Sequence, residues 1–205
     1  MSLLARPRPA RLVVPRVQAA LAGLACAAMV ELALRASEPA GSHILGQNLA
    51  EAHAGLASLW LVLALVARPV RPLWAWPLAA RRALGVLAFL EAVAHVVYAF
   101  QHELGGTLDV WAFLAPDTQA ALGLGAASLF LLALLAATST DWAVSGRGKR
   151  WKQLHRLVAP AFALAVAHIV WMGVHFGLGF GLLGVAPLAS IALAALWLGV
   201  SIFRR

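Results

Sequence analysis

One long apolar run shows most clearly what kind of protein this is, and it reads LHRLVAPAFALAVAHIVWMGVHF at residues 154–176. After Arg156 this run holds no Asp, Glu, Lys or Arg, and its only ionisable side chains are His168 and His175. A helix rises about 1.5 Å per residue, so a run of this length exceeds the roughly 30 Å hydrocarbon core of a bilayer. The run therefore predicts a transmembrane helix.

Five more runs of similar character fill most of the remaining chain. They are residues 17–34, 49–67, 83–100, 119–138 and 182–203. Proline and glycine mark the joints between them, including Gly146 and Gly148 before the fifth run, and the alternation typical of membrane β-strands is absent. We expect an all-α, polytopic membrane bundle of six transmembrane helices over residues 17–203, preceded by a basic segment at residues 1–16. That segment resembles the start of a signal peptide, but the first run lacks a clean cleavage site, so we expect it to be retained.

The overall composition agrees with this reading. Hydrophobic residues make up 62% of the 205 positions and charged residues only 12%, whereas soluble domains carry about a quarter. The single cysteine excludes a disulfide framework and an iron–sulfur cluster held by cysteines. The net charge of +8 would suit nucleic-acid binding only on a soluble basic face, which this chain does not offer.

The basic residues also predict the orientation in the membrane. With six spans, 15 of the 16 lysines and arginines fall on one side, and only Arg35 falls on the other. Because positively charged connections stay in the cytoplasm, both termini are expected to be cytoplasmic.

Ionisable side chains within spans are costly, and each is a candidate for function. The candidates are Glu31, Glu51, His53, Glu91, His95, His102, His155, His168 and His175. His95 follows Arg82 by thirteen residues, and His168 follows His155 by thirteen, which puts both about 20 Å from the cytoplasmic side of two parallel spans. Two neutral imidazoles facing each other in a bundle can supply the axial ligands of a haem iron, although a hydrogen-bonded interior pair without metal is the alternative.

A second group of ionisable residues lies further out. His102 follows His95 by seven residues and His175 follows His168 by seven, so each returns to nearly the same face of its helix. Together with His53 they can bind haem propionates or a quinone or form a proton path, or they can be solvated at the interface. We expect His53 to be structural and Glu91 to be either a structural contact or part of the site. Glu31 and Glu51 are expected to be solvated near span ends. No C-x-x-C-H motif is present, so a bound haem would be b-type.

Three stretches carry a family resemblance: Thr138-Ser139-Thr140, GKRWKQLHRLV at residues 148–158, and HIVW at residues 168–171. With Arg81-Arg82-x-x-Gly85 followed by His95, they resemble the MsrQ (YedZ) family, the haem-binding membrane subunits of bacterial MsrPQ methionine sulfoxide reductase systems, within the ferric-reductase-like transmembrane group. The resemblance covers nearly the whole chain, and implies a ferric-reductase-like haem-binding domain at residues 17–203 in the bacterial inner (cytoplasmic) membrane.

The resemblance also implies roles for individual residues. His95 and His168 would be axial ligands of an outer b-type haem, and His155 would be the third family histidine, near the cytoplasmic face. Relatives with two stacked haems carry a second histidine where this chain has Arg82, so an inner haem would need His155 and a further ligand. Arg81 and Arg82 would hold haem propionates or the phosphate of FMN.

The function that the resemblance implies is transmembrane electron transfer. Electrons would come from a cytoplasmic flavin reductase or from quinol, and would pass to a periplasmic MsrP-like molybdopterin reductase. The chain would be a non-catalytic electron-transfer subunit, surrounded by lipid and without a nucleic-acid partner. A generic ferric reductase, a quinol-oxidising cytochrome b and a transporter with a histidine relay are the alternatives.

Overall fold

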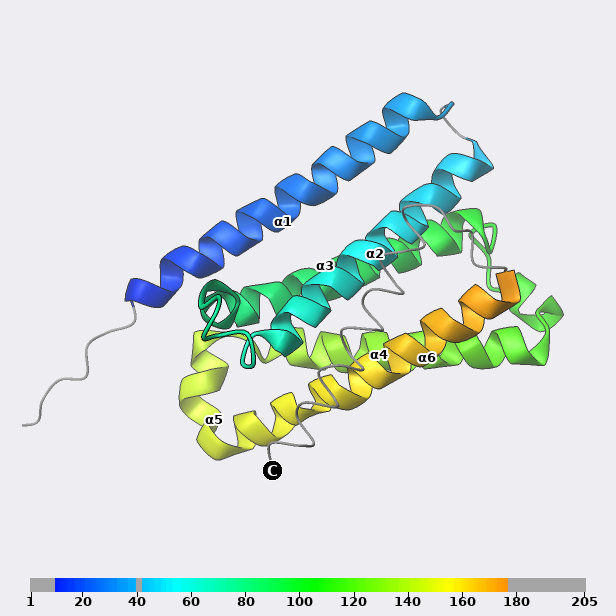
Figure 1. The fold of residues 1–205 in the computed structure, drawn as a ribbon. Coiled ribbons are helices and arrows are strands. Elements are labelled where there is room, and N and C mark those ends of the chain that lie inside the picture. Colours follow the sequence, from blue (N-terminus) through cyan, green and yellow to red (C-terminus); the bar gives the residue numbers. More distant parts are fainter. Residues whose placement is uncertain (1–9, 40–41, 177–205) are drawn as a thin grey trace, which may run out of the picture.

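The computed structural model describes residues 10–39 and 42–176, and this part of the chain is helical without β-strands. The α-helices are α1 (Ala10–Ser37), α2 (His43–Val66), α3 (Trp76–His102), α4 (Pro116–Ala137), α5 (Asp141–Leu154) and α6 (Val158–Phe176) (Figure 1). Two short 3-10 helices, η1 (Asp109–Phe113) and η2 (His155–Leu157), lie in the connections before α4 and α6.

Five of the described helices are long and apolar enough to cross a membrane. They are Val14–Ser37, Ile44–Val66, Trp76–His102, Pro116–Ala137 and Arg150–Met172. These segments coincide with the first five predicted spans, so the all-α, multi-pass architecture is confirmed for the described residues. The sixth predicted span, residues 182–203, lies outside them, and the sidedness of the termini stays a prediction.

Helix ends are set by capping residues rather than by where the apolar runs stop. The Ser42 hydroxyl accepts a hydrogen bond from the Leu45 amide (3.0 Å) and starts α2 six residues before the predicted run. Pro77 and Pro116 occupy the first turns of α3 and α4, where a missing N–H costs nothing. The described helices therefore extend beyond the predicted apolar runs at most of their ends.

The connection before the fifth span contains a helix that the sequence analysis did not predict. The Thr140 side chain caps α5 by accepting from the Ala143 amide (3.2 Å), and Asp141 lies in the first turn, where a negative charge is favourable. Gly146 therefore lies within a helix rather than in a loop. Because α5 is short and polar, it adds no membrane span.

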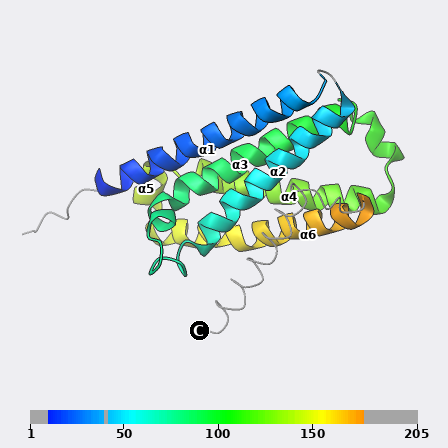
Figure 2. The ribbon, with the colours of Figure 1, turned by 45° about the horizontal axis from the view of Figure 1, so that its top comes forward.

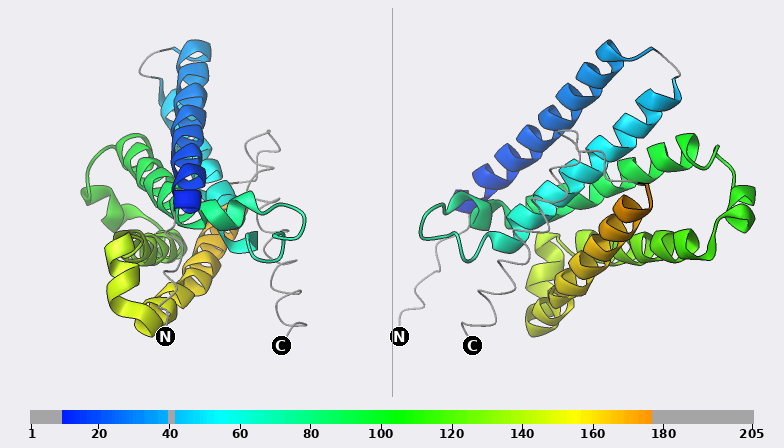
Figure 3. Two further views of the ribbon diagram at one scale, coloured as in Figure 1. Left: turned by 90° about the vertical axis from the view of Figure 1, so that its left-hand side faces the viewer. Right: turned by 45° about the vertical axis from the view of Figure 1, so that its right-hand side comes forward.

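The long helices pack as two groups. Helices α1, α2 and α3 lie together, α4 packs against α6, and the groups meet along α3 and α4 (Figure 2). One apolar cluster joins α2, α3, α4 and α6 through Leu61, Leu65, Ala88, Leu132 and Phe162. Helix α1 lies at the outside of the bundle (Figure 3), where Leu21, Met29 and Leu32 are exposed as expected of a surface that faces lipid.

One end of the bundle is held by charged side chains, and we call it the basic end. Asp141 at the start of α5 pairs with Arg16 of α1 (3.1 Å) and with Arg82 of α3 (2.5 Å). The hydrogen bond and charge of Arg82 hold the pKa of the Asp141 carboxyl below its ordinary value. A cavity of about 320 Å³ opens beside these residues, between α1 and α3.

Candidate functional site

Two imidazole rings from different helices meet inside the bundle. The ring centres of His95 on α3 and His168 on α6 lie 6.3 Å apart, with an angle of 66° between the ring planes. The prediction that these residues lie at equal depth on neighbouring spans is confirmed.

Each of these rings is oriented by a main-chain carbonyl of a neighbouring helix. His95 donates from Nδ1 to the Ala50 oxygen of α2 (2.9 Å), and His168 donates from Nδ1 to the Ala121 oxygen of α4 (2.8 Å). A carbonyl oxygen can only accept, so the proton must be on Nδ1 in both rings. A neutral imidazole with its proton on Nδ1 presents a free lone pair on Nε2. Histidines that bind metals are commonly oriented in this way.

The separation of the two rings suits a metal bound between them. Two metal–nitrogen bonds of about 2 Å, with about 1.1 Å from each nitrogen to its ring centre, place the ring centres about 6 Å apart. The observed 6.3 Å agrees with this geometry. The tautomers and the spacing therefore fit the axial ligands of a haem iron.

A glycine on α4 leaves room for one of the rings. A β-carbon placed on Gly125 would lie 3.0 Å from Nδ1 and 3.1 Å from Cε1 of His168, which is closer than ordinary van der Waals contact. Ala121, which orients the same ring, lies one turn earlier on the same face of α4. Helix α4 therefore sets both the direction and the position of the His168 ring.

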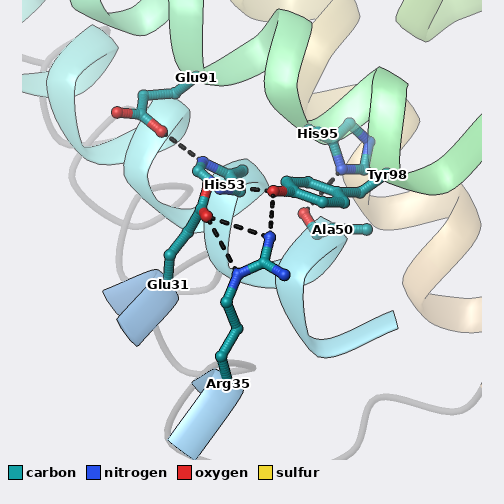
Figure 4. A network of polar contacts seen from close by, with 7 residues as sticks. All are labelled: Glu31, Arg35, Ala50, His53, Glu91, His95 and Tyr98. Carbon is teal, nitrogen blue, oxygen red and sulfur yellow. Dashed lines mark hydrogen bonds and ion pairs between the residues drawn. The ribbon is translucent and has the colours of Figure 1, made fainter. Parts of the chain in front are cut away.

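A second polar cluster lies beside the histidine pair (Figure 4). His53 of α2 is buried between two carboxylates: its Nδ1 is hydrogen-bonded to Oε2 of Glu91 on α3 (2.6 Å), and its Nε2 to Oε1 of Glu31 on α1 (3.3 Å). Glu91 is also buried. One imidazole thus bridges carboxylates from two other helices.

Tyr98 and Arg35 extend this cluster to the surface of the bundle. The Tyr98 hydroxyl donates to Oε1 of Glu31 (3.1 Å) and accepts from Nη2 of Arg35 (3.0 Å), while Arg35 also donates to Oε2 of Glu31. The Tyr98 ring stacks on His53 with ring centres 5.3 Å apart. The sequence predicts a solvated Glu31, and its side chain is 32% exposed, but it also receives hydrogen bonds from side chains of three helices.

The remaining candidates at this end of α3 and α6 are placed as follows. The His102 ring stacks on Tyr98 at 6.4 Å and lies against Gly46 of α2, where a β-carbon would overlap it. His102 and His53 thus both stack on Tyr98, which agrees with the prediction that they lie together at the outer end of the bundle. The side chain of His175 is outside those that the structure describes, so its predicted place in this group is not tested. Glu51 is exposed and accepts a hydrogen bond from Gln47 (3.1 Å), as expected for a solvated group.

His155, Arg81 and Arg82 lie near the basic end, apart from the histidine pair. The His155 ring packs on Trp151 with centres 4.0 Å apart, and its Nε2 lies 3.3 Å from the Thr138 hydroxyl. Arg81 donates to the Ala64 oxygen (2.9 Å), and Arg82 is engaged by Asp141. Thirteen residues, or about 20 Å along α3, separate Arg82 from His95. A contact of Arg81 or Arg82 with haem propionates stays a prediction.

Tyr98 and Arg35 were not predicted from the sequence, although a signal was present for each. Arg35 is the one lysine or arginine on the predicted outer side of the membrane. Glu31 precedes it by four residues, which is the spacing of an ion pair on one helix face. Tyr98 is the single tyrosine of the chain and lies within an apolar run. A buried phenol requires a hydrogen-bond partner, which points to the nearby carboxylates.

Comparison with known proteins agrees with this arrangement. A family model described as "Ferric reductase like transmembrane component" matches residues 52–166, more than half of the chain. The chain is 38% identical over 136 residues (62% of this chain, 64% of the relative) to "Protein-methionine-sulfoxide reductase heme-binding subunit MsrQ" of Rhodospirillum rubrum. Proteins of the same name from Brucella anthropi and Brucella ovis are 36% identical over 54% of this chain and 34% identical over 62% of it. The matched regions span 50 to 64% of the length of these three relatives.

Proposed function

The chain belongs to the ferric-reductase-like transmembrane family, and on this premise we propose that it is a haem-binding subunit that transfers electrons across a membrane. The single observation that carries the proposal is the His95–His168 pair. Both rings have their Nδ1 proton committed to a carbonyl, both have a free Nε2 lone pair, and their centres are 6.3 Å apart. These are the requirements of a bis-histidine haem site.

The residues of the chain have two tasks in this function. The Ala50 and Ala121 carbonyls fix the tautomers and directions of the ligands, which keeps both nitrogens basic and correctly aimed. The long apolar helices that carry the two histidines would keep the site in a low dielectric, which tunes its potential. A b-type haem bound there would supply a reversible one-electron couple in the outer half of the membrane.

We assign the donor side to the basic end and place it in the cytoplasm, following the distribution of lysine and arginine. There Arg82 and Arg16 line the cavity of about 320 Å³, and His155 and Arg81 lie close by. These side chains suit an anionic group such as the phosphate of FMN, or a second haem with His155 as one ligand. The donor would be a flavin reductase or quinol.

The acceptor follows from the relatives, which are named as heme-binding subunits of a protein-methionine-sulfoxide reductase. We propose an MsrP-like reductase on the periplasmic side of the bacterial inner membrane as the partner that receives the electrons. Reduction of methionine sulfoxide itself would take place in that partner, because the proposed role of this chain ends with delivery of electrons.

Electron transfer across sealed vesicles tests the proposal. Vesicles that contain the purified protein are loaded with ferricyanide, and dithionite is added outside. We expect the trapped ferricyanide to be reduced faster than in empty vesicles. His95→Ala and His168→Ala should bring the rate back to that of empty vesicles, whereas Glu51→Gln, at an exposed position on α2, should not. Wild-type vesicles no faster than empty ones would overturn the proposal.

A further inference from the structure

The cluster around His53 has the construction of a proton relay. Its imidazole is 3% exposed and contacts a different carboxylate through each ring nitrogen: Glu91 at 2.6 Å and Glu31 at 3.3 Å. When both of its nitrogens are protonated, an imidazole in this position donates to both carboxylates, and it can release the Nδ1 proton to Glu91 while it keeps the one on Nε2. A carboxylate at each ring nitrogen gives the imidazole two proton acceptors, which suits the transfer of a proton through the cluster.

The charges in the cluster balance when one proton is on the imidazole. Protonated His53 and Arg35 then offset the carboxylates of Glu31 and Glu91. Burial of an uncompensated charge is costly, so this neutral arrangement is favoured at rest. Glu91 is the buried carboxylate of the cluster, and its Oε2 lies 2.6 Å from Nδ1 of His53.

The cluster has one exposed end and one buried end. The Glu31 side chain is 32% exposed and that of Arg35 is 49% exposed, whereas that of Glu91 is 5% exposed. Protons from solvent therefore reach Glu31 first and Glu91 last. Glu91 lies four residues before His95 on α3, one helical turn or about 6 Å along the axis. The buried end of the path thus lies beside the proposed haem site.

This inference rests on the proposed function, since it concerns the charge that an electron brings to the histidine pair. Charges in an apolar interior interact strongly even several ångströms apart, so an added electron favours uptake of a proton nearby. The ionisable groups linked to Glu91 and His53 are Glu31 and Arg35 on α1 and Tyr98 and His102 on α3. His95, one turn after Glu91 on α3, meets His168 of α6. Among them, Glu91 joined to His53 is the buried acid with a path to solvent.

We propose that Glu31, His53 and Glu91 take up one proton from solvent for each electron held at the His95–His168 site. Protonated His53 gives its Nδ1 proton to the Glu91 carboxylate and keeps the proton on Nε2, while the Glu31 carboxylate takes up one proton from solvent. One electron and one proton are gained together: both carboxyls and the imidazole become neutral, and the net charge of the cluster rises by one to offset the electron. When the electron leaves, the proton returns by the same path.

The pH dependence of the midpoint potential of the purified, haem-containing protein tests the relay. We expect the wild-type potential to fall by about 59 mV for each tenfold drop in proton concentration between about pH 6 and pH 8. Glu91→Gln keeps the shape of the side chain but removes the acid, so its potential should be nearly independent of pH. Glu51→Gln removes an exposed carboxylate from α2 and should keep the wild-type slope.

Each result decides a specific point. A wild-type potential without pH dependence, or an unchanged slope in Glu91→Gln, would overturn the relay and leave the proposed function standing. A wild-type protein without haem would overturn the proposed function and the relay with it. A second measurement uses the wild type alone: reduction in weakly buffered solution with a pH indicator should take up about one proton per electron, and no uptake would also overturn the relay.

Discussion

Replacement of Gly125 by alanine tests how narrowly the histidine pair is positioned. The new methyl carbon would lie 3.0 Å from Nδ1, 3.1 Å from Cε1 and 3.2 Å from Cγ of His168. Ordinary contact begins near 3.4 Å, so the ring must retreat by a few tenths of an ångström. That shift stretches its 2.8 Å hydrogen bond to the Ala121 oxygen and moves Nε2 away from a shared metal.

The expected loss of haem binding in Gly125→Ala follows from the energetic cost of overpacking. Insertion of one methyl group into a packed site typically costs about 1–3 kcal/mol, which corresponds to roughly 5- to 150-fold weaker haem binding if the site carries the whole cost. Functional sites tolerate displacements of only about 0.5 Å, so we also expect a changed ligand field. Haem content per protein and the absorption spectrum of the purified protein measure both effects.

Gly123→Ala is the matched control, because it lies on the same helix and has no atom within 4 Å of its new methyl group. Both variants gain the same helix propensity, up to about 1 kcal/mol, so a difference between them reports on contact with His168 alone. Equal haem content and equal spectra in the two variants would refute the reasoning.

Three further changes have defined outcomes. Gly46→Ala forces the His102 ring away and should lower the free energy of unfolding of the protein by about 1–3 kcal/mol, measured in detergent. An unchanged free energy of unfolding would contradict the contact between Gly46 and His102. His155→Ala should leave the bis-histidine spectrum in place, since that ring lies near the basic end; its loss would contradict the placement. Asp141→Asn should remove a component of stability at neutral pH. Because Arg82 lowers the pKa of this carboxyl, that component is complete above its ordinary value of 3.8 and is lost as the pH falls below it, so the variant should approach wild type in acid. A constant difference at all pH values would contradict the ion pair.

The histidine pair could be predicted from the sequence because it depends only on regular geometry. The equal thirteen-residue steps to His95 and His168 translate into equal depth through the rise of the helix. Their hydrogen bonds could not be predicted, because the acceptors are main-chain carbonyls of Ala50 and Ala121, and a carbonyl has no sequence signature. The packing of α2 and α4 against the pair decides which carbonyls are reached.

The cluster around His53 shows a different limit of sequence patterns. Depth suggested that Glu31 lies near a span end, and this is correct, but depth does not tell which helix face meets a neighbour. The structure turns Glu31 toward His53 and Tyr98, which come from two other helices. Helix α5 could not be predicted from apolar runs, because it is polar and depends on its Thr140 cap.

The optical spectrum of the purified protein tests the central claim most directly. We expect a reversible, reduced-minus-oxidised b-type haem signal in the wild type that is lost in both His95→Ala and His168→Ala. It should persist in His102→Ala, whose ring stacks on Tyr98 instead. A colourless wild-type protein, or an unchanged signal in either variant of the histidine pair, would contradict the account.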